Sequence, residues 1–153
     1  IQVVVHPQSV IHSMVSFIDG AIMAQLGQPD MRTPIAVALG FSSRLESGVN
    51  QLDFTKISNL TFREPDFERY PCLRLAMQAS LSGQAATTCF NASNEVAVDA
   101  FLHNRISYFD IAKVVEETLN QMPYATLSSI DEILQTDAKS REVALKIVET
   151  LAC

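Results

Sequence analysis

The sequence predicts an α+β protein in which a β-hairpin or partial sheet is followed by a long connector and a C-terminal bundle of four to five helices. Two β-prone apolar runs, Ser9–Ile18 and Ala21–Leu26, flank Asp19-Gly20, and an Asp-Gly pair between such runs is the strongest short-range hairpin signal. After Tyr70, apolar residues recur at helical spacing instead. The three parts are expected at residues 1–41, 42–70 and 71–153.

Composition and charge narrow the class of protein. Of the 153 residues, 48% are hydrophobic and 18% are charged, which is typical of an ordinary globular chain. The formal net charge of −6 argues against non-specific binding to nucleic acid, which needs clustered Lys and Arg. The chain has no basic-then-apolar leader, and its apolar runs fall short of the ~20 residues that span a bilayer. We therefore expect neither nucleic acid nor membrane as a partner.

The cysteines and the start of the chain carry two further expectations. Cys72, Cys89 and Cys153 are odd in number, far apart and without a CxxC pair, which favours reduced thiols and a cytoplasmic protein. The chain opens directly on the β-prone run Ile1–Val5, without an initiator Met. Because an isolated hairpin is marginal in water, these strands are expected to need neighbours, and a boundary just before Ile1 would explain their absence.

The first part is expected to be mainly β. Gln2–His6 is predicted as a short strand that Pro7 ends. A two-residue turn at Asp19-Gly20 would place His12 opposite Gly27, at the open end of the hairpin. Both faces of the hairpin are apolar, which favours burial on both sides, as in the middle of a sheet or at a subunit interface. The expected cross-strand pairs are Phe17 with Ile22, Val15 with Ala24, and Ser13 with Leu26.

A short helix and the connector come next. Thr33 is expected as the N-cap and Pro34 as the first residue of a helix that ends near Phe41. Residues 42–70 show no sustained period of either kind, and Gly, Asn, Asp and Pro interrupt them. We interpret them as an extended connector between two structural units, with one short strand near Leu60–Phe62.

The remainder is expected to be helical. Pro71 begins a helix that Gly83 ends, with Leu75, Ala76 and Ala79 on one face. A second helical region covers Ala85–His103, with a break near Asn91. Its apolar stripe is expected to contain Val96, Ala100 and Phe101, widened by Val98 and Leu102.

Two capping patterns mark the remaining helices. Ser107 with Asp110 precedes a stripe that Pro123 ends, and Ser129 with Glu132 starts a short helix through Leu134. Asp137 is expected to cap a separate last helix. The expected apolar stripes of these helices are Ile111, Val114, Val115, Leu119 and Met122, and then Val143, Ala144, Ile147, Val148 and Leu151.

Several long segments resemble one enzyme family. HPQSVIHSMV, then DG, then AQLG and PDMRTPIA are similar to the end of the catalytic domain of the 1-deoxy-D-xylulose 5-phosphate reductoisomerases. The similarity continues through SGVNQLDF, FERYPCLRLA, GQAATTCFNASNEVAV and REVALKIVETLA into the C-terminal helical domain. It covers essentially the whole chain.

The resemblance implies an oxidoreductase activity that this chain shares with further polypeptide. Members of the family use NADPH and Mg²⁺ or Mn²⁺ to convert 1-deoxy-D-xylulose 5-phosphate to 2-C-methyl-D-erythritol 4-phosphate, in non-mevalonate isoprenoid biosynthesis, as homodimers. The positions that hold cofactor, metal and substrate phosphate would precede Ile1. Consistent with this, neither GxGxxG nor GxxxxGK[ST] occurs in the sequence. This chain alone is therefore expected to be inactive and to bind neither NADPH nor metal.

The resemblance also selects four residues that would line the substrate pocket. His12 matches a histidine near the pocket and is expected to help arrange the site rather than transfer a proton; otherwise it is a satisfied histidine at a sheet end. Ser9 matches a serine near the substrate and metal, although a hydroxyl bonded to backbone is an equal alternative. Pro29 and Met31 match the pocket wall, with plain loop packing as the alternative.

Other polar residues have simpler interpretations. His6 precedes a proline and is expected to be structural, and His103 lies near a helix C-terminus, where a cation is favourable. The cluster Asn91–Glu95 is expected to cap a helix rather than bind an anion. On one extended strand, His6 and His12 would lie roughly 20 Å apart, too far for one metal ion. The acids Asp19, Asp30 and Asp53 occur in separate turns, so the sequence predicts no metal site.

Two other classes of function remain open at this point. A non-catalytic helical interaction or dimerisation module, with the hairpin pairing to a partner, fits the missing cofactor motifs equally well. A DNA-binding helical domain is a third option that the acidic charge disfavours. Whichever function holds, residues 1–26 are expected to self-associate, because strands with two apolar faces seek pairing partners.

Overall fold

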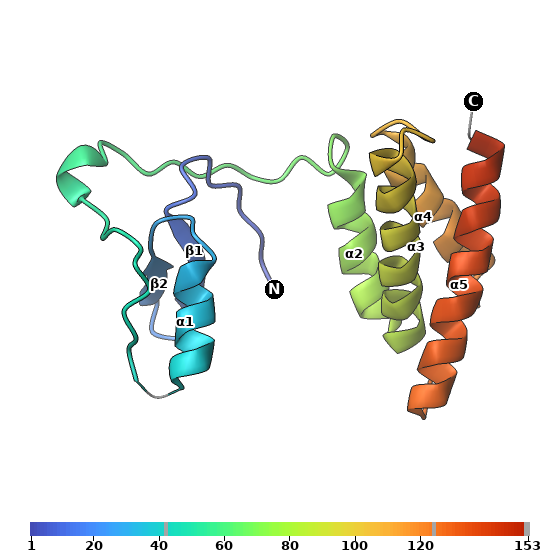
Figure 1. Ribbon diagram of the computed structural model, residues 1–153, viewed down its shortest axis with the longest axis horizontal. Helices are drawn as coiled ribbons and strands as arrows, with labels where there is room; N and C mark the ends of the chain where they lie inside the picture. The colour runs from blue at the N-terminus through green and yellow to red at the C-terminus, as the bar shows by residue number, and fades with distance from the viewer. Residues whose placement is uncertain (42, 124, 152–153) are drawn as a thin grey trace. The chain divides into compact units, whose positions relative to one another are not determined.

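The computed structural model describes residues 1–41, 43–123 and 125–151, and the chain divides into two compact units, Ile1–Pro65 and Asp66–Cys153. The first unit contains an antiparallel hairpin, one α-helix and a 3₁₀ turn, and the second contains four α-helices (Figure 1). The expected α+β class is confirmed. The elements of the first unit are β1 (Ile11–Ser16), β2 (Ile22–Leu26), α1 (Arg32–Gly40) and η1 (Phe54–Lys56). Those of the second are α2 (Pro71–Ser82), α3 (Gln84–Leu102), α4 (Asp110–Gln121) and α5 (Ile130–Leu151).

The hairpin exists, but its register differs from the expected one. The amide of Phe17 donates to the Ala21 carbonyl at 2.8 Å, and that of Gly20 donates to the Phe17 carbonyl at 3.0 Å. Gly20 has φ +89°, so the loop contains three residues and ends in a left-handed glycine instead of forming a two-residue turn. The third loop residue shifts every pair by one, and the predicted pairs are therefore wrong. The observed pairs are Ser16 with Ile22, Val15 with Met23, Met14 with Ala24, and Ser13 with Gln25.

A bulge interrupts β1 at His12. Ser13 pairs with Gln25 while Ile11 pairs with Leu26, so His12 is an extra residue without a partner in the ladder. The amide of Gly27 donates to the Val10 carbonyl at 3.0 Å, so the pairing of His12 with Gly27 was wrong. The ring still lies near that glycine, because a Cβ atom at residue 27 would be 3.9 Å from His12 Cε1.

The two short strands predicted at Gln2–His6 and Leu60–Phe62 are reduced to one bridge. Val5 and Arg63 exchange backbone hydrogen bonds of 2.9 and 3.0 Å, and no longer strand forms around them in the described chain. The turn at Pro7 ends the pairing on one side, since proline supplies no amide donor. Side chains, described below, continue the contact instead.

Helix α1 begins two residues before the expected start. The Asp30 carboxylate accepts from the Arg32 amide at 2.9 Å, and the Asp30 carbonyl accepts from the Thr33 amide at 3.2 Å. Asp30 thus accepts hydrogen bonds from the first free amides of the helix. The prediction that Thr33 is the N-cap and Pro34 the first helical residue was wrong. No residue of α1 is buried.

The helical bundle is built around α3, which packs against α2, α4 and α5. Leu75 and Ala79 of α2 are buried, and Gly83 ends that helix, as predicted. The buried face of α3 is made almost entirely of small residues. Leu102, expected on that stripe, is 68% exposed and lies off it. The buried residues of α3 are Ala85, Ala86, Cys89, Ala92, Ser93, Ala97 and Ala100.

Two predicted helix boundaries are absent. Helix α3 passes through Asn91 without a break, and the Asn91 side chain donates to Glu95 at 3.2 Å along the exposed face. Helix α5 passes through Asp137, which does not cap a separate helix. Asp137 instead accepts from Arg141 at 2.7 Å, and Arg141 also donates to Glu95 of α3 at 2.6 Å. Asn91 and Asp137 each bond along their own helix rather than at a helix end, and Arg141 links α5 to α3.

The predicted helix starts at Ser107 and Ser129 are confirmed, but the second begins the long helix α5 and not a short helix that ends at Leu134. The amide and hydroxyl of Ser107 donate to the Asp110 carboxylate at the start of α4. The Glu132 amide donates to the Ser129 hydroxyl at 3.2 Å at the start of α5. The buried stripe of α4 matches the predicted one apart from Met122, which is half-buried, and Thr118, which joins it. Two predictions, the start of the connector at Ser42 and the thiol of Cys153, lie outside the described residues.

Candidate functional site

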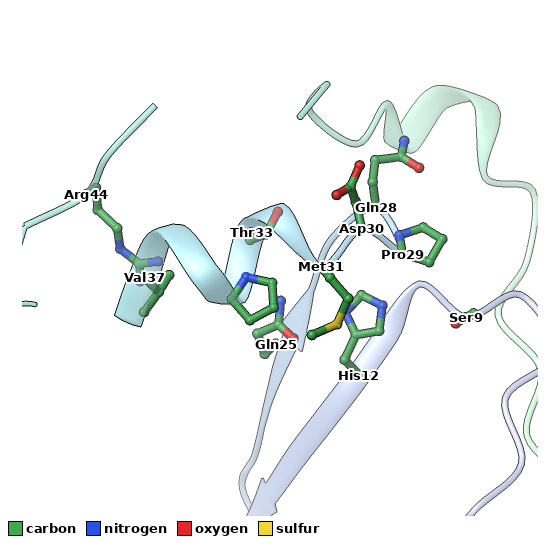
Figure 2. A pocket seen from close by; sticks show the side chains of 11 residues that line it. Ser9, His12, Gln25, Gln28, Pro29, Asp30, Met31, Thr33, Val37 and Arg44 are labelled. Atoms are coloured by element: carbon green, nitrogen blue, oxygen red, sulfur yellow. The ribbon is translucent and has the colours of Figure 1, made fainter. Parts of the chain in front are cut away.

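The first unit contains a cavity of about 700 Å³ at the open end of the hairpin (Figure 2). All four residues that the resemblance selected line it, and they come from three separate segments of chain. Sequence reasoning missed its other lining residues. The lining residues are Ser9, His12, Gln25, Gln28, Pro29, Asp30, Met31, Thr33, Pro34, Val37 and Arg44.

Ser9 enters the cavity from a tight turn. Pro7 and Gln8 form the turn, and the Ser9 amide donates to the His6 carbonyl at 3.0 Å. Ser9 has φ +50°, the left-handed region that non-glycine residues seldom adopt. Such strained positions cluster at functional sites, where the surrounding structure holds them in place.

His12 enters from the bulge in β1. A bulge turns a side chain away from the regular alternation of its strand, and bulges are frequent beside functional sites. Figure 2 shows the His12 ring and the Met31 side chain directed toward the same space. Gly27 keeps the neighbouring loop free of a side chain near that ring.

Pro29 and Met31 lie on the loop between β2 and α1, which a bidentate ion pair holds in shape. The guanidinium of Arg32 donates to both carboxylate oxygens of Asp30, with Arg32 Nη2 at 2.7 Å from Asp30 Oδ2. The Asp30 amide donates to the Gln28 carbonyl at 2.8 Å. The hydrogen bonds from the Arg32 side chain first, and from the Arg32 amide next, lower the pKa of Asp30 from its usual value and keep it a carboxylate.

Four of the seven lining residues that were missed show which of them the sequence could have indicated. Gln25 and Gln28 flank Gly27 at the open end of the hairpin, where the resemblance already placed the pocket, so their position in the chain was a usable signal. Val37 lies four residues after Thr33 on α1, so helical spacing places both on one face. Arg44 follows the helix, and no local pattern in the sequence indicated it.

The remaining histidines have structural partners. His6 stacks on Phe62 with ring centroids 4.9 Å apart, and its Nδ1 lies 2.8 Å from the Thr61 carbonyl oxygen. His6 and His12 do not share a strand, because the turn at Pro7 separates them, and both line a second cavity of about 610 Å³. His103 Nδ1 lies 2.9 Å from the Asp99 carbonyl oxygen at the end of α3.

The side chains that line the larger cavity are suited to recognising a ligand. They combine a hydroxyl, an imidazole, amides and a guanidinium with an apolar wall, a set that can orient a small polar ligand and exclude water from it. Over residues 1–41, 43–123 and 125–151, no three His, Cys, Asp or Glu side chains gather closely enough to hold one metal ion. The residues described here therefore do not fit a metal site.

Two further observations concern parts of the protein outside the cavity. Cys72 and Cys89 are free thiols, and burial raises the pKa of both, which disfavours the thiolate form. Of the helices described, none combines the length and the apolar character needed to cross a bilayer.

Comparison with known proteins identifies the family. A family model for the DXP reductoisomerase C-terminal domain matches residues 26–143. The 1-deoxy-D-xylulose 5-phosphate reductoisomerase of Shewanella sediminis is 53% identical over 151 residues, which are 99% of this chain and 38% of that protein. The corresponding enzyme of Haemophilus influenzae is 51% identical over 147 residues, 96% of this chain and 37% of that protein.

Solved structures agree in fold. The Zymomonas mobilis 1-deoxy-D-xylulose 5-phosphate reductoisomerase in complex with NADPH superposes with a TM-score of 0.88 at 48% identity, over 98% of this chain and 40% of that one. A DOX-P reductoisomerase in complex with magnesium gives 0.87 at 39% identity, over 98% and 40%. The chain thus spans about 38% of the length of the curated relatives it matches. It belongs to the DXP reductoisomerase family and corresponds to the C-terminal portion of its members.

Proposed function

We propose that this chain supplies one wall of the substrate pocket of a 1-deoxy-D-xylulose 5-phosphate reductoisomerase. The observation that carries the proposal is that Ser9, His12, Pro29 and Met31, selected from the sequence as pocket residues, all line one cavity. The names of the relatives support the reaction, and the NADPH and magnesium complexes of solved relatives support the cofactors. The substrate is then a sugar phosphate.

In this proposal the chain binds and orients, while further polypeptide completes the site. The Ser9 hydroxyl and the His12 imidazole hydrogen-bond the polar groups of the ligand, and Pro29 and Met31 cover its less polar side and exclude water. When bound to the complete site, NADPH would supply the hydride and Mg²⁺ or Mn²⁺ would stabilise negative charge on substrate oxygens. Because the described residues offer no ligand set for the metal, we assign its binding to polypeptide that precedes this portion in the relatives.

The test is NADPH oxidation, followed by absorbance, with 1-deoxy-D-xylulose 5-phosphate and Mn²⁺ or Mg²⁺. This chain is assayed alone and after mixing with the N-terminal portion of the Shewanella sediminis relative, produced as a separate polypeptide. We expect no turnover from either piece and turnover from the mixture. Turnover by this chain alone would contradict the assignment of metal and cofactor to the other portion.

A pair of histidine variants makes the test specific to the pocket. His12→Ala in the mixture is expected to lower kcat/KM about tenfold or more, because losing one orienting contact is enough to misplace a substrate. His103→Ala, which removes an exposed histidine of the helical unit, is the matched control and is expected to leave kcat/KM unchanged. Equal activity of both variants would remove His12 from the proposed site.

One observation favours a second candidate, a non-catalytic interaction or dimerisation module. Large apolar side chains on both strands are exposed, among them Val15 at 57% and Met23 at 66%. Such a surface can serve association without catalysis. If the mixture is inactive while this chain forms stable homo-oligomers, the interaction module becomes the better account. As part of the reductoisomerase proposal, we also propose that the protein is a homo-oligomer and is located in the cytoplasm.

A further inference from the structure

The pocket does not explain why the backbone of Ser9 has a positive φ angle. With φ +50°, Ser9 is one of two non-glycine residues with positive φ in the described chain, and it is the one that lines the cavity. A residue in this region is strained, and it stays there only where neighbouring contacts fix its backbone. The contacts in question lie immediately before it, in the turn His6–Ser9.

Thr61 makes those contacts with its backbone and its side chain. The Thr61 carbonyl oxygen lies 2.8 Å from Nδ1 of His6, and the Thr61 amide donates to Gln8 Oε1 at 3.2 Å. The Thr61 hydroxyl accepts from Gln8 Nε2 at 2.8 Å and donates to Gln8 Oε1 at 3.1 Å. Thr61 therefore holds both residues that flank Pro7, one of them directly adjacent to Ser9.

The residues next to Thr61 add further contacts, and we call the contacts of residues 61–63 with residues 5–8 the clamp. Val5 and Arg63 exchange two hydrogen bonds, and Phe62 stacks on the His6 ring. Residues 61–63 thus fasten the segment that leads into Ser9 by backbone, side-chain and ring contacts. Thr61 itself does not line the cavity that contains Ser9 and His12. It can act on a ligand there only by fixing where Ser9 points.

We infer that Thr61, through Gln8, is a positioning residue that holds the Ser9 hydroxyl in its place in the substrate pocket. The role given to the Ser9 hydroxyl rests on the proposed function. The clamp itself rests on the hydrogen bonds alone. Thr61→Val removes the hydroxyl while keeping the shape and the backbone bonds. Thr61→Ser keeps the hydroxyl.

The kinetic test uses this chain fused behind the N-terminal portion of the Shewanella sediminis relative, so that the whole reaction can be followed. Thr61→Val is expected to lower kcat/KM about tenfold, in line with the sensitivity of catalysis to small misplacements, and Thr61→Ser is expected to restore it. Thr55→Val is the matched control, because the Thr55 hydroxyl donates to Asp53 in the same connecting segment. It is expected to leave kcat/KM unchanged.

A double-mutant cycle separates positioning from general stability. In a Ser9→Ala background the hydroxyl to be positioned is gone, so adding Thr61→Val is expected to cost no further activity. If Thr61→Val lowers kcat/KM by the same factor in both backgrounds, it acts on stability or on another residue, and the inference is overturned. Full activity of the single Thr61→Val variant would overturn it as well.

Hydrogen exchange supplies a readout that does not depend on activity. The Ser9 amide is bonded to the His6 carbonyl, so a peptide covering residues 5–13 reports whether the turn is closed. Thr61→Val is expected to speed exchange in that peptide about tenfold, and Thr55→Val to leave it unchanged. If the unsubstituted fusion is inactive, the proposed function fails while the exchange result still tests the clamp; unchanged exchange would refute the clamp itself.

Discussion

At the scale of single residues, Asp110 shows how one carboxylate organises a helix start. It accepts from the Ser107 amide at 3.0 Å and from Lys113 Nζ at 2.7 Å. These hydrogen bonds, that of Lys113 first and those of Ser107 next, lower the pKa of Asp110 from 3.8 to about 2. Because the folded-state pKa lies below the unfolded value, ionised Asp110 stabilises the fold above pH 3.8, and this stabilisation is lost as the pH falls to about 2.

Replacing that carboxylate should change the pH dependence of stability. Asp110→Asn is expected to lower Tm at pH 7, and the gap to the unsubstituted chain should narrow as the pH falls from 3.8 to about 2. Thermal unfolding followed by circular dichroism at a series of pH values measures this. Asp131→Asn, at an exposed acid in the first turn of α5, is the control. A gap that stays constant over that pH range would contradict the role given to the charge.

Comparison of two helix starts shows what residue patterns can and cannot predict. The Ser107–Asp110 spacing was sufficient, because the cap is local and both partners lie within one turn. At α1 the Thr33-Pro34 pattern was equally good, yet Asp30 took the first amides. The competing cap was visible in the sequence, but its ion pair with Arg32, which stabilises that geometry, was not.

At the scale of elements, the turn between α2 and α3 depends on glycine. Gly83 has φ +100° and ψ −172°, a conformation that residues with a Cβ atom hardly adopt. No neighbouring atom lies within 4 Å of a Cβ built there, so the cost of a substitution would come from the backbone alone.

We therefore expect Gly83→Ala to lower the free energy of unfolding by about 1–3 kcal/mol. Urea denaturation followed by the helical circular dichroism of the whole chain measures it. Ser82→Ala, at the preceding helical residue, should stay within about 0.5 kcal/mol. If the two variants are equally stable, the chain can turn between α2 and α3 in another way.

The small residues of α3 fix how closely its neighbours approach. Ala86, Ala92 and Ala97 are fully buried between helices. Ala97→Leu should lower the free energy of unfolding by about 1–3 kcal/mol, because a close-packed core must shift to admit the added atoms. Leu102→Ala, on the exposed side of the same helix, should change it by less than about 0.5 kcal/mol. Urea denaturation distinguishes the two, and an unaffected Ala97→Leu variant would indicate a loosely packed helix.

Element boundaries failed where a polar residue had more than one possible role. Asn91 and Asp137 were interpreted as helix ends because both residue types favour caps. In the structure each makes a hydrogen bond to the residue four positions later in the same helix, Glu95 or Arg141. Similarly, Asp19-Gly20 marked the hairpin correctly but not its loop length, and the third loop residue decided the register.

At the scale of the whole molecule, the site was only partly predictable. Its four selected residues came from family resemblance, and the structure adds the physical reason that they meet: a turn, a bulge and a loop converge on one cavity. Arg44 could not be predicted, because it reaches that cavity only through the path of the folded chain, whereas helical spacing from Thr33 would have indicated Val37. Local patterns specify segments, whereas a cavity depends on how segments are brought together.

The two units differ in how much apolar surface they bury. The helical unit has two clusters of buried hydrophobic residues, whereas Val10 is the one buried hydrophobic residue among those described in the first unit. The hairpin exposes Phe17, Ile22 and Met23 to solvent, at 47%, 63% and 66%. Exposed apolar strands with free edges pair readily with other strands. We therefore expect this surface to drive association.

In sedimentation velocity experiments at micromolar concentration, the isolated chain should sediment as a species larger than a monomer. The expected contact is edge pairing or exchange of residues 1–26. Met23→Lys, which places a charge on an exposed strand position, should shift the population toward monomer, since edge lysines block strand pairing. Leu134→Lys, at a 61% exposed position of α5, should not. A strictly monomeric chain would mean that the hairpin stays unpaired despite its apolar faces. Equal effects of the two lysines would place the contact outside the hairpin.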